Sequence, residues 1–381
     1  MSEAIQGYDL SGAANYHYGH FPPASNAIDY ARLAPLLTKA TAALARYDTK
    51  LERLHNKELL LAPLRNAEAV VSSRIEGTIA TLDEILRIQA DDDEDGNDSN
   101  ERYRSEAIEV YSYTRAVKRA QMMIDQGIPI SSRLIREAHS QLLFFGRGAD
   151  KTPGEFKRDQ NYVVDTRNKK ILFVPMDENR LDDGVAALER YIHDLTIEPL
   201  VQTAVMHVEF EALHPFKDGN GRLGRMLIPL NLWQRGIIHA PHFYVSPAIE
   251  ERREEYVDRL RAVSERNAWT DWIAFFLEIL HRQAELNLSI TDKIEVLYQE
   301  MNERFRDILK SQWSTVALDY IFTKGYFRNS SFTANSGIPS QTAHRISKQL
   351  IDDGMLTVVE AAAGSRAAML AFRPLLEVVR A

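Results

Sequence analysis

The 381-residue chain contains no cysteine, so disulfide bonds and thiol chemistry play no part in its stability or function. It also has no run of 18 apolar residues, and we therefore expect no membrane-spanning helix. Its first residues, MSEAIQGYDLSG, lack the basic and apolar stretches of a secretory signal peptide. These absences predict a cytoplasmic protein without a membrane segment.

Excess positive charge is also missing. The chain has 46 Lys and Arg residues against 54 Asp and Glu residues, which gives a formal net charge of −8. This balance argues against a general binder of nucleic acid or anionic membranes. The length and a hydrophobic content of 45% are sufficient for two or three domains with substantial cores.

The most informative stretch is HPFKDGNGRLGR, which runs from residue 214 to residue 225. It combines an imidazole, a carboxylate, two arginines and three glycines, and glycine allows backbone amides to converge on an anion. Val205 to Leu213 has helical apolar periodicity, in a helix predicted to run from Pro199 to Leu213, and so has Arg222 to Gln234. The second helix would direct its N-terminus at a bound phosphate. The lysine P-loop, GxxxxGK[ST], is absent, and no strand precedes the stretch.

This stretch resembles the HxFx(D/E)GNGRxxR signature of the Fic family, whose enzymes mostly transfer AMP from ATP to a protein hydroxyl. Eight positions at fixed spacing are far more specific than a short glycine motif. Every one of them is met, by His214, Phe216, Asp218, Gly219, Asn220, Gly221, Arg222 and Arg225.

The resemblance implies a role for each polar group. His214 would be the general base that deprotonates the target hydroxyl, and the ordinary pKa of an imidazole suits that task. Asp218 would hold Mg²⁺, which prefers oxygen ligands and bridges substrate phosphates. The phosphates themselves would be bound by Gly219, Asn220, Gly221, Arg222 and Arg225, with Arg225 nearest the γ-phosphate.

A zinc site is an alternative use of part of this stretch. His207, Glu211 and His214 are spaced so that they would share one helical face. The chain has no HExxH motif, however, and a zinc site would not need the Gly-Asn-Gly that follows. The zinc interpretation is therefore disfavoured.

A second motif lies near residue 75. The segment from Ser72 to Gly77 resembles the [S/T]xxxE[G/N] inhibitory signature of many Fic proteins. Ser72 and Glu76 would share one face at the end of a helix predicted to run from about Pro63 to Arg74, and Gly77 suits the position that terminates it. The resemblance implies that Glu76 pairs with Arg225 and misplaces the γ-phosphate of ATP. The alternative is a capped helix with a surface glutamate.

Residues 153–175 contain the clearest β pattern, with short apolar strands on both sides of a polar turn at 165–170. In Fic proteins the corresponding hairpin is a flap that holds the target segment by strand pairing. A purely structural hairpin is the alternative. The flap strand would be formed by Ile171, Leu172, Phe173 and Val174.

The domain organisation follows from these motifs and from the remaining periodicity. We expect a mainly α-helical protein with a Fic-type core, a β-hairpin flap and an extended N-terminal arm over about the first 25 residues. The acidic run at 91–100 is predicted to be a solvated loop. The predicted domains are an N-terminal helical region at 1–125, a Fic catalytic core at 126–289, a connector helix at 290–310 and a winged-helix domain at 311–381.

The winged-helix prediction rests on a helix–turn–helix pattern followed by two short strands. Residues 311–381 carry 7 basic and 5 acidic residues, a balance of +2 that is weak for DNA binding. Gln341, Thr342, Arg345 and Lys348 would face a DNA groove if one were bound. Contact with a protein, or a homodimer, is favoured over DNA.

The leading hypothesis is a self-inhibited adenylyltransferase that moves AMP from Mg·ATP to a Tyr, Thr or Ser of a target protein. A second hypothesis reverses the reaction, with Glu76 orienting water that removes AMP from a modified protein. A third is a DNA-binding regulator that keeps the catalytic fold as a sensor. The sequence does not identify the target protein.

Overall fold

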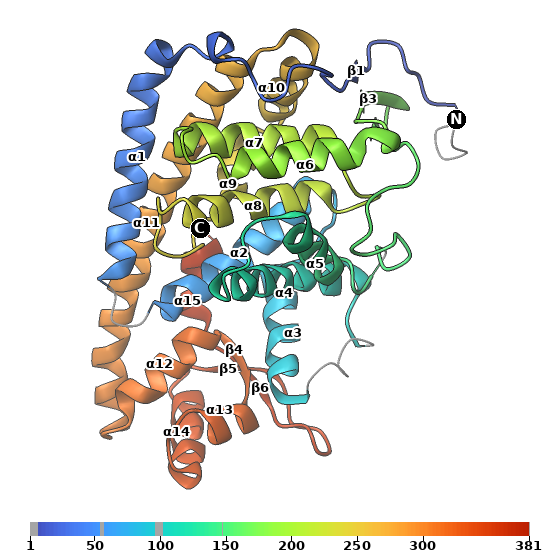
Figure 1. The fold of residues 1–381 in the computed structure, drawn as a ribbon. Coiled ribbons are helices and arrows are strands. Elements are labelled where there is room, and N and C mark those ends of the chain that lie inside the picture. The colour runs from blue at the N-terminus through green and yellow to red at the C-terminus, as the bar shows by residue number, and fades with distance from the viewer. Residues whose placement is uncertain (1–6, 54–56, 96–101, 147, 381) are drawn as a thin grey trace. The chain divides into compact units, whose positions relative to one another are not determined.

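The computed structural model describes residues 7–53, 57–95, 102–146 and 148–380 (Figure 1). Over these residues the protein is mainly helical, with two small three-stranded sheets, as the sequence predicted. The chain forms two compact units. One contains residues 1–49 and 115–285, and the other contains residues 50–114 and 286–381.

Three helices have residues in both units: α1 (Tyr30–Glu52), α4 (Ser105–Asp125) and α11 (Trp269–Leu309). The first unit otherwise contains β1 (Ala14–Asn15), η2 (Ser25–Ala27), α5 (Ser132–Leu142), β2 (Val163–Asp165), β3 (Lys170–Val174), η4 (Glu178–Arg180), α6 (Leu181–Ile192), α7 (Pro199–Leu213), α8 (Asn220–Gln234), α9 (Ser246–Glu251) and α10 (Arg253–Arg266). The second contains α2 (Glu58–Ile75), α3 (Leu82–Asp95), α12 (Ser314–Lys324), β4 (Tyr326–Arg328), α13 (Asn329–Asn335), α14 (Ser340–Asp352), β5 (Thr357–Glu360), β6 (Met369–Ala371) and α15 (Arg373–Arg380).

Helices α6, α7 and α8 lie side by side at the centre of the first unit (Figure 1). Helix α7 has the predicted bounds, because Pro199 opens it and the Glu198 carboxylate caps it by accepting from the Val201 amide at 2.7 Å. All residues of α7 except Pro199 and Glu211 are buried. Helix α7 is therefore packed on every side and has no polar face. Together with α8 it can hold the signature loop between them rigidly.

His207 lies within this buried part of α7. Its Nε2 is 2.8 Å from the Tyr256 hydroxyl, and its ring stacks near Trp272. Burial, with a smaller contribution from the Arg225 charge, lowers the pKa of His207 to about 3. His207 is thus a neutral core histidine bonded to a tyrosine, and the disfavoured zinc interpretation gains nothing from its position.

The first sheet has the strand order β1-β3-β2. Strands β2 and β3 form the predicted antiparallel hairpin, in which Asp165 is opposite Lys170. The Asp165 carboxylate accepts hydrogen bonds from the amides of Arg167 and Asn168, which closes the turn. The N-terminal arm supplies β1, which pairs with β3 in parallel, so the arm packs on the body of the protein as expected.

The acidic run differs from the prediction. Helix α3 continues to Asp95, so residues 91–95 are helical and not a loop, while residues 96–100 lie outside the described part. Asp91 is 1% exposed and accepts a hydrogen bond from Arg328 Nε at 2.8 Å. Composition alone indicated solvation, because the arginine that neutralises this carboxylate lies more than 200 residues further along the chain.

Two helix boundaries also differ. Helix α2 begins at Glu58 and contains Pro63, although we expected the helix to begin at the proline. The connector helix expected at 290–310 and the apolar residues that precede it are parts of one continuous helix, α11, which ends at Leu309. No glycine or proline lies between them, and periodicity alone could not join an apolar half to a charged half.

In the C-terminal segment, helices α13 and α14 are joined by a turn at Gly337, which has φ +76°. The antiparallel sheet β4-β6-β5 packs with these helices around Phe322, Phe332 and Leu370. These elements follow the order of the predicted helix–turn–helix and strands. Their identification as a winged helix stays a prediction.

Candidate active site

His214 lies where α7 ends and the signature loop begins. Its backbone has φ +45° and ψ +59°, the left-handed conformation that non-glycine residues seldom adopt. Its amide donates to the Phe210 carbonyl at 3.1 Å, and its Nδ1 is 3.3 Å from the Glu211 carbonyl oxygen. The backbone thus turns sharply at His214, whose side chain is half-buried. Strained backbone conformations of this kind are common at functional sites.

The loop is closed by the side chain of Asn220. Its Oδ1 accepts from the Phe216 amide at 2.9 Å, and its Nδ2 donates to the Phe216 carbonyl at 2.8 Å. Gly219 has φ +78° and caps α8, and its amide donates to Asp218 Oδ1 at 2.6 Å. Asn220 therefore fixes the loop, which is a different use of its amide group from the phosphate binding predicted for it.

Asp218 and Arg222 lie at the N-terminus of α8, and Arg225 follows on the same helix. The side chain of Asp218 is 43% exposed, and Arg222 Nη2 lies 3.5 Å from its Oδ1. The Arg222 and Arg225 side chains belong to the first turns of α8 and are almost fully buried. Two guanidinium groups and a helix N-terminus favour an anion at this point. An accessible carboxylate beside them has the oxygen donors that a magnesium ion prefers, so the residues present fit that ion.

His139 on α5 supports the loop, and the sequence reasoning missed it. Its Nδ1 accepts from the Gly154 amide at 2.8 Å, so Nε2 carries the proton and donates to the Asp218 carbonyl at 2.9 Å. Its ring stacks on Phe216 with centroids 3.7 Å apart. Burial lowers the pKa of His139 to about 4, which keeps the imidazole neutral and maintains this pattern.

Asn161 and Lys157 support the other end of the loop. Asn161 Nδ2 donates to the carbonyls of His214 and Phe216, each at 2.9 Å, and its Oδ1 accepts from Lys157 Nζ at 2.7 Å. Lys157 Nζ also donates to the Leu213 carbonyl at 3.1 Å. Burial lowers the pKa of Lys157 to about 7. The backbone at His214 is therefore held by side-chain bonds from outside the signature.

Only a weak signal in the sequence points to these residues. His139 occupies the apolar face of α5 together with Leu134, Ile135, Ala138 and Leu142, and a polar residue in such a stripe needs a partner. Lys157 and Asn161 belong to a segment without periodicity. Their contacts depend on how that segment packs against the signature loop, which the sequence does not show.

The inhibitory motif lies at the end of α2. Gly77 has φ +87°, its amide donates to the Arg74 carbonyl, and the Thr78 amide donates to the Ser73 carbonyl. This pair of bonds is the Schellman arrangement that a glycine after a helix permits. Ser72 is buried in α2, and Glu76 is exposed at its C-cap. These residues belong to the second unit and Arg225 to the first, so pairing between Glu76 and Arg225 stays a prediction.

The predicted flap strand is the central strand of its sheet. Ile171 and Phe173 are buried, whereas Leu172 and Val174 are partly exposed. One edge of β3 pairs with β2 and the other with the N-terminal arm. The four residues therefore form a strand, as predicted, but the arm already pairs with the edge opposite β2.

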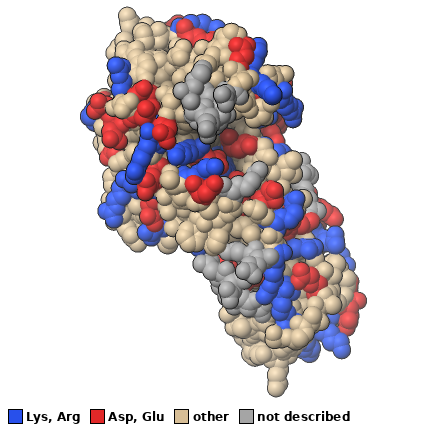
Figure 2. Space-filling view, turned by 90° about the vertical axis from the view of Figure 1, so that its right-hand side faces the viewer, with Lys and Arg blue, Asp and Glu red and all other residues tan. Residues whose placement is uncertain are grey.

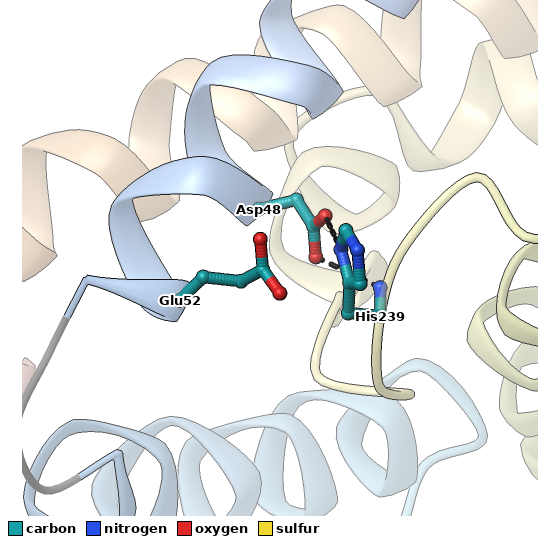
Figure 3. Close-up of side chains that lie close together, drawn as sticks. All are labelled: Asp48, Glu52 and His239. Atoms are coloured by element: carbon teal, nitrogen blue, oxygen red, sulfur yellow. Dashed lines mark hydrogen bonds and ion pairs between the residues drawn. The ribbon is translucent and has the colours of Figure 1, made fainter.

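Asp48 and His239 form a second polar cluster in the first unit (Figure 3). The Asp48 carboxylate accepts from the His239 amide at 3.0 Å and pairs with its Nδ1 at 2.5 Å. An imidazole and a carboxylate are also metal-ligand types. Here the two groups bond to each other and connect α1 to the segment after α8.

Charged residues of both signs are interspersed over the face shown in Figure 2. Over the described residues, none of the helices is both long and apolar enough to cross a membrane.

The fold and this loop define a helical protein built around a glycine-rich loop between two buried helices. Comparison with known protein families identifies the family to which this architecture belongs. The family model described as Fic/DOC family matches residues 129–232, and the model described as Fic/DOC family N-terminal matches residues 34–122. The chain belongs to the Fic family.

The relatives are distant and longer. Protein adenylyltransferase Fic of Drosophila melanogaster is 26% identical over 218 residues, which cover 55% of this chain and 41% of that protein. Protein adenylyltransferase fic-1 of Caenorhabditis elegans is 29% identical over 105 residues, which cover 27% of this chain and 19% of that protein. The chain thus spans less than half the length of these relatives.

Solved structures show the same fold. A Fic family protein from Desulfovibrio desulfuricans G20 superposes with a TM-score of 0.56 at 16% identity, over 89% of this chain and 95% of that one. Fic-1 from C. elegans gives a TM-score of 0.51 at 19% identity, over 69% of this chain and 76% of that one. At such identities the similarity establishes the fold alone.

Proposed function

We propose that the protein transfers AMP from Mg·ATP to a Tyr, Thr or Ser hydroxyl of a target protein. The observation that carries the proposal is the half-buried imidazole of His214, on a loop whose backbone is held by the bonds described above and which leads into α8 with its two buried arginines. The name adenylyltransferase, borne by the relatives, supports the same reaction.

In the proposed reaction, His214 accepts the proton of the target hydroxyl. The hydroxyl oxygen forms a bond to the α-phosphorus of ATP, and the bond from that phosphorus to the β-phosphate bridging oxygen breaks. Pyrophosphate leaves with the released electron pair. Backbone amides at the start of α8, together with Arg222 and Arg225, stabilise the charge that develops on the phosphates. Asp218 would hold Mg²⁺, which neutralises part of the phosphate charge when bound.

We also propose that Glu76 restrains this reaction. A carboxylate at the C-cap of α2 is a suitable partner for a guanidinium that otherwise binds the γ-phosphate. With Arg225 engaged, ATP would bind with its α-phosphate poorly aligned, and an error near 1 Å costs about 100-fold in rate. Glu76→Gly is therefore expected to raise AMP transfer.

The test is transfer of label from ATP carrying a radioactive α-phosphate, with mass spectrometry of the modified chain. Glu76→Gly should label itself or added protein more strongly than the unaltered chain, and adding His214→Ala should abolish labelling. Glu265→Gly is the matched control, because Glu265 is an exposed glutamate near the end of another helix. Equal labelling of all the variants would refute the mechanism.

A further inference from the structure

The N-terminal arm occupies one edge of the strand expected to bind a target. Near one end of β3, the Asp9 amide donates to the Lys169 carbonyl at 2.8 Å, and the Ile171 amide donates to the Asp9 carbonyl at 2.9 Å. Near the other end, Ala14 is opposite Phe173, and the Tyr16 amide donates to the Val174 carbonyl at 2.9 Å. These are the backbone bonds that an added strand makes.

The pairing is interrupted between these two points. Two residues lie between Lys170 and Phe173, whereas four lie between Asp9 and Ala14. The extra length forms a turn in which the Ala13 amide donates to the Leu10 carbonyl and Gly12 has φ +79°. An interrupted strand makes fewer ladder bonds than a continuous one, so a continuous segment would compete well for the same edge.

Among the described residues of the arm, the buried attachment lies at its C-terminal side. The Tyr16 hydroxyl donates to Glu209 at 2.6 Å, and His17 bridges Glu209 and Ser264 at 2.8 Å each, in a buried cluster. Residues 9–12 are exposed, by contrast. Such segments open at small free-energy cost, while the buried anchor keeps the arm at high effective concentration near β3.

The occupied edge belongs to β3, and the residues just after β3 contact the end of α7, next to the signature loop. Beyond β3, the Met176 amide donates to the Ala212 carbonyl at 3.3 Å, two residues before His214. The opposite edge of β3 is used by β2. An extended polypeptide that pairs with β3 must therefore displace the arm.

We propose that the N-terminal arm, residues 7–16, is a built-in competitor for the extended segment of a protein substrate at the edge of β3. The proposal rests on the proposed function for the identity of that substrate. Target docking would require exchange of one strand for another, and this requirement is separate from the control exerted by Glu76. It would disfavour short or folded segments that cannot supply a continuous strand.

The test compares three variants in the Glu76→Gly background. The first begins at Tyr16 and so keeps the anchor. The second, Asp9→Pro, removes the amide that bonds to Lys169, and Asp9→Ala is its matched control because it keeps that amide. The probe is a mixture of fluorescent 12-residue peptides, each with one Tyr, Ser or Thr. AMP transfer is measured with Mg·ATP, and binding is measured by anisotropy without nucleotide.

We expect the truncated chain to bind and label peptides on the order of 10-fold more efficiently, as when a state populated about a tenth of the time becomes fully populated. Asp9→Pro should show a smaller gain and Asp9→Ala none, with an unchanged KM for ATP. Unchanged peptide binding in both the truncated and Asp9→Pro chains would overturn the proposal and make the arm a permanent strand. If the truncated chain does not fold, the comparison of Asp9→Pro with Asp9→Ala decides the question. If every chain binds peptide and none transfers AMP, the proposed function fails and the binding result still decides this proposal.

Discussion

At the scale of single residues, the geometry of the signature loop depends on side chains outside the signature. His139, Lys157 and Asn161 bond to the backbone of residues 213–218, and all of them approach from segments before the signature in sequence. They are positioning residues, and their removal should disturb the rate more than ATP binding.

Asn161→Ala tests this positioning role. It removes the donors to the His214 and Phe216 carbonyls, so the imidazole loses its fixed location. In the Glu76→Gly background we expect kcat for AMP transfer to fall about 10- to 100-fold with little change in KM for ATP. Asn161→Asp keeps the shape without the donors and should behave alike. Asn168→Ala, on the exposed turn of the flap, is the control and should leave kcat unchanged.

His207 makes stability depend on pH. Its pKa is about 3 in the folded protein and near 6.5 when unfolded, so between these values the unfolded chain binds more protons. The contribution of the neutral imidazole is complete above pH 6.5 and is lost as pH falls towards 3. The loss should reach about 5 kcal/mol at most. The free energy of unfolding, measured with urea from pH 7 to pH 4, should fall less for His207→Asn than for the unaltered chain. The same fall with pH in both chains would contradict this.

At the scale of elements, α7 and α8 approach each other closely at position 224, which is not a fixed position of the signature but holds a glycine in this chain. A Cβ added to Gly224 would lie 2.5 Å from Glu211 Oε1 and 3.1 Å from Phe210 Cδ1, both on α7. The third glycine of the stretch was taken from the sequence as part of an anion loop. In the structure it lies inside α8 and permits helix packing.

Gly224→Ala should therefore lower the free energy of unfolding by about 1–3 kcal/mol, the usual cost of overpacking. Urea denaturation measures the change. Glu211→Ala in the same chain removes the clashing carboxylate, and the double variant should recover part of the loss. An unchanged unfolding midpoint in Gly224→Ala would mean that the helices separate at no cost.

At the scale of the whole molecule, segments far apart in sequence build the second unit. Asp91 on α3 accepts from Arg328 and Arg366, and Arg328 also donates to Glu360 at 2.6 Å. Both Asp91 and Arg328 are 1% exposed. Burial alone would raise the pKa of Asp91, but bonds from Arg328 and Tyr103 outweigh it and leave the pKa lowered. The helix after the inhibitory motif is thus tied to the C-terminal sheet.

Asp91→Ala should leave Arg328 buried without its main partner and destabilise the second unit by about 3–5 kcal/mol. Asp93→Ala is the matched control, because its pair with Lys324 is partly exposed and should contribute no more than about 1 kcal/mol. Thermal unfolding followed by circular dichroism would compare the two variants. Equal losses of stability in the two variants would show that the buried pair contributes no more than the partly exposed one.

Much of the fold was predictable because it is encoded locally. The bounds of α7 follow from Pro199 and apolar periodicity, the turn of the flap from its polar residues, and the end of α2 from Gly77. The signature likewise lies within twelve consecutive residues, so its identity needs no tertiary information. Spacing and turn chemistry act over a few residues and are therefore visible in the chain itself.

Only the tertiary structure decided which faces meet. It placed His139 and Asn161 against the signature loop, paired the N-terminal arm with β3, and buried Asp91 in a run that composition marked as solvated. Each of these outcomes joins segments tens to hundreds of residues apart. Their stability comes from desolvation and hydrogen-bond partners that exist only after packing, and no local pattern in the sequence carries that information.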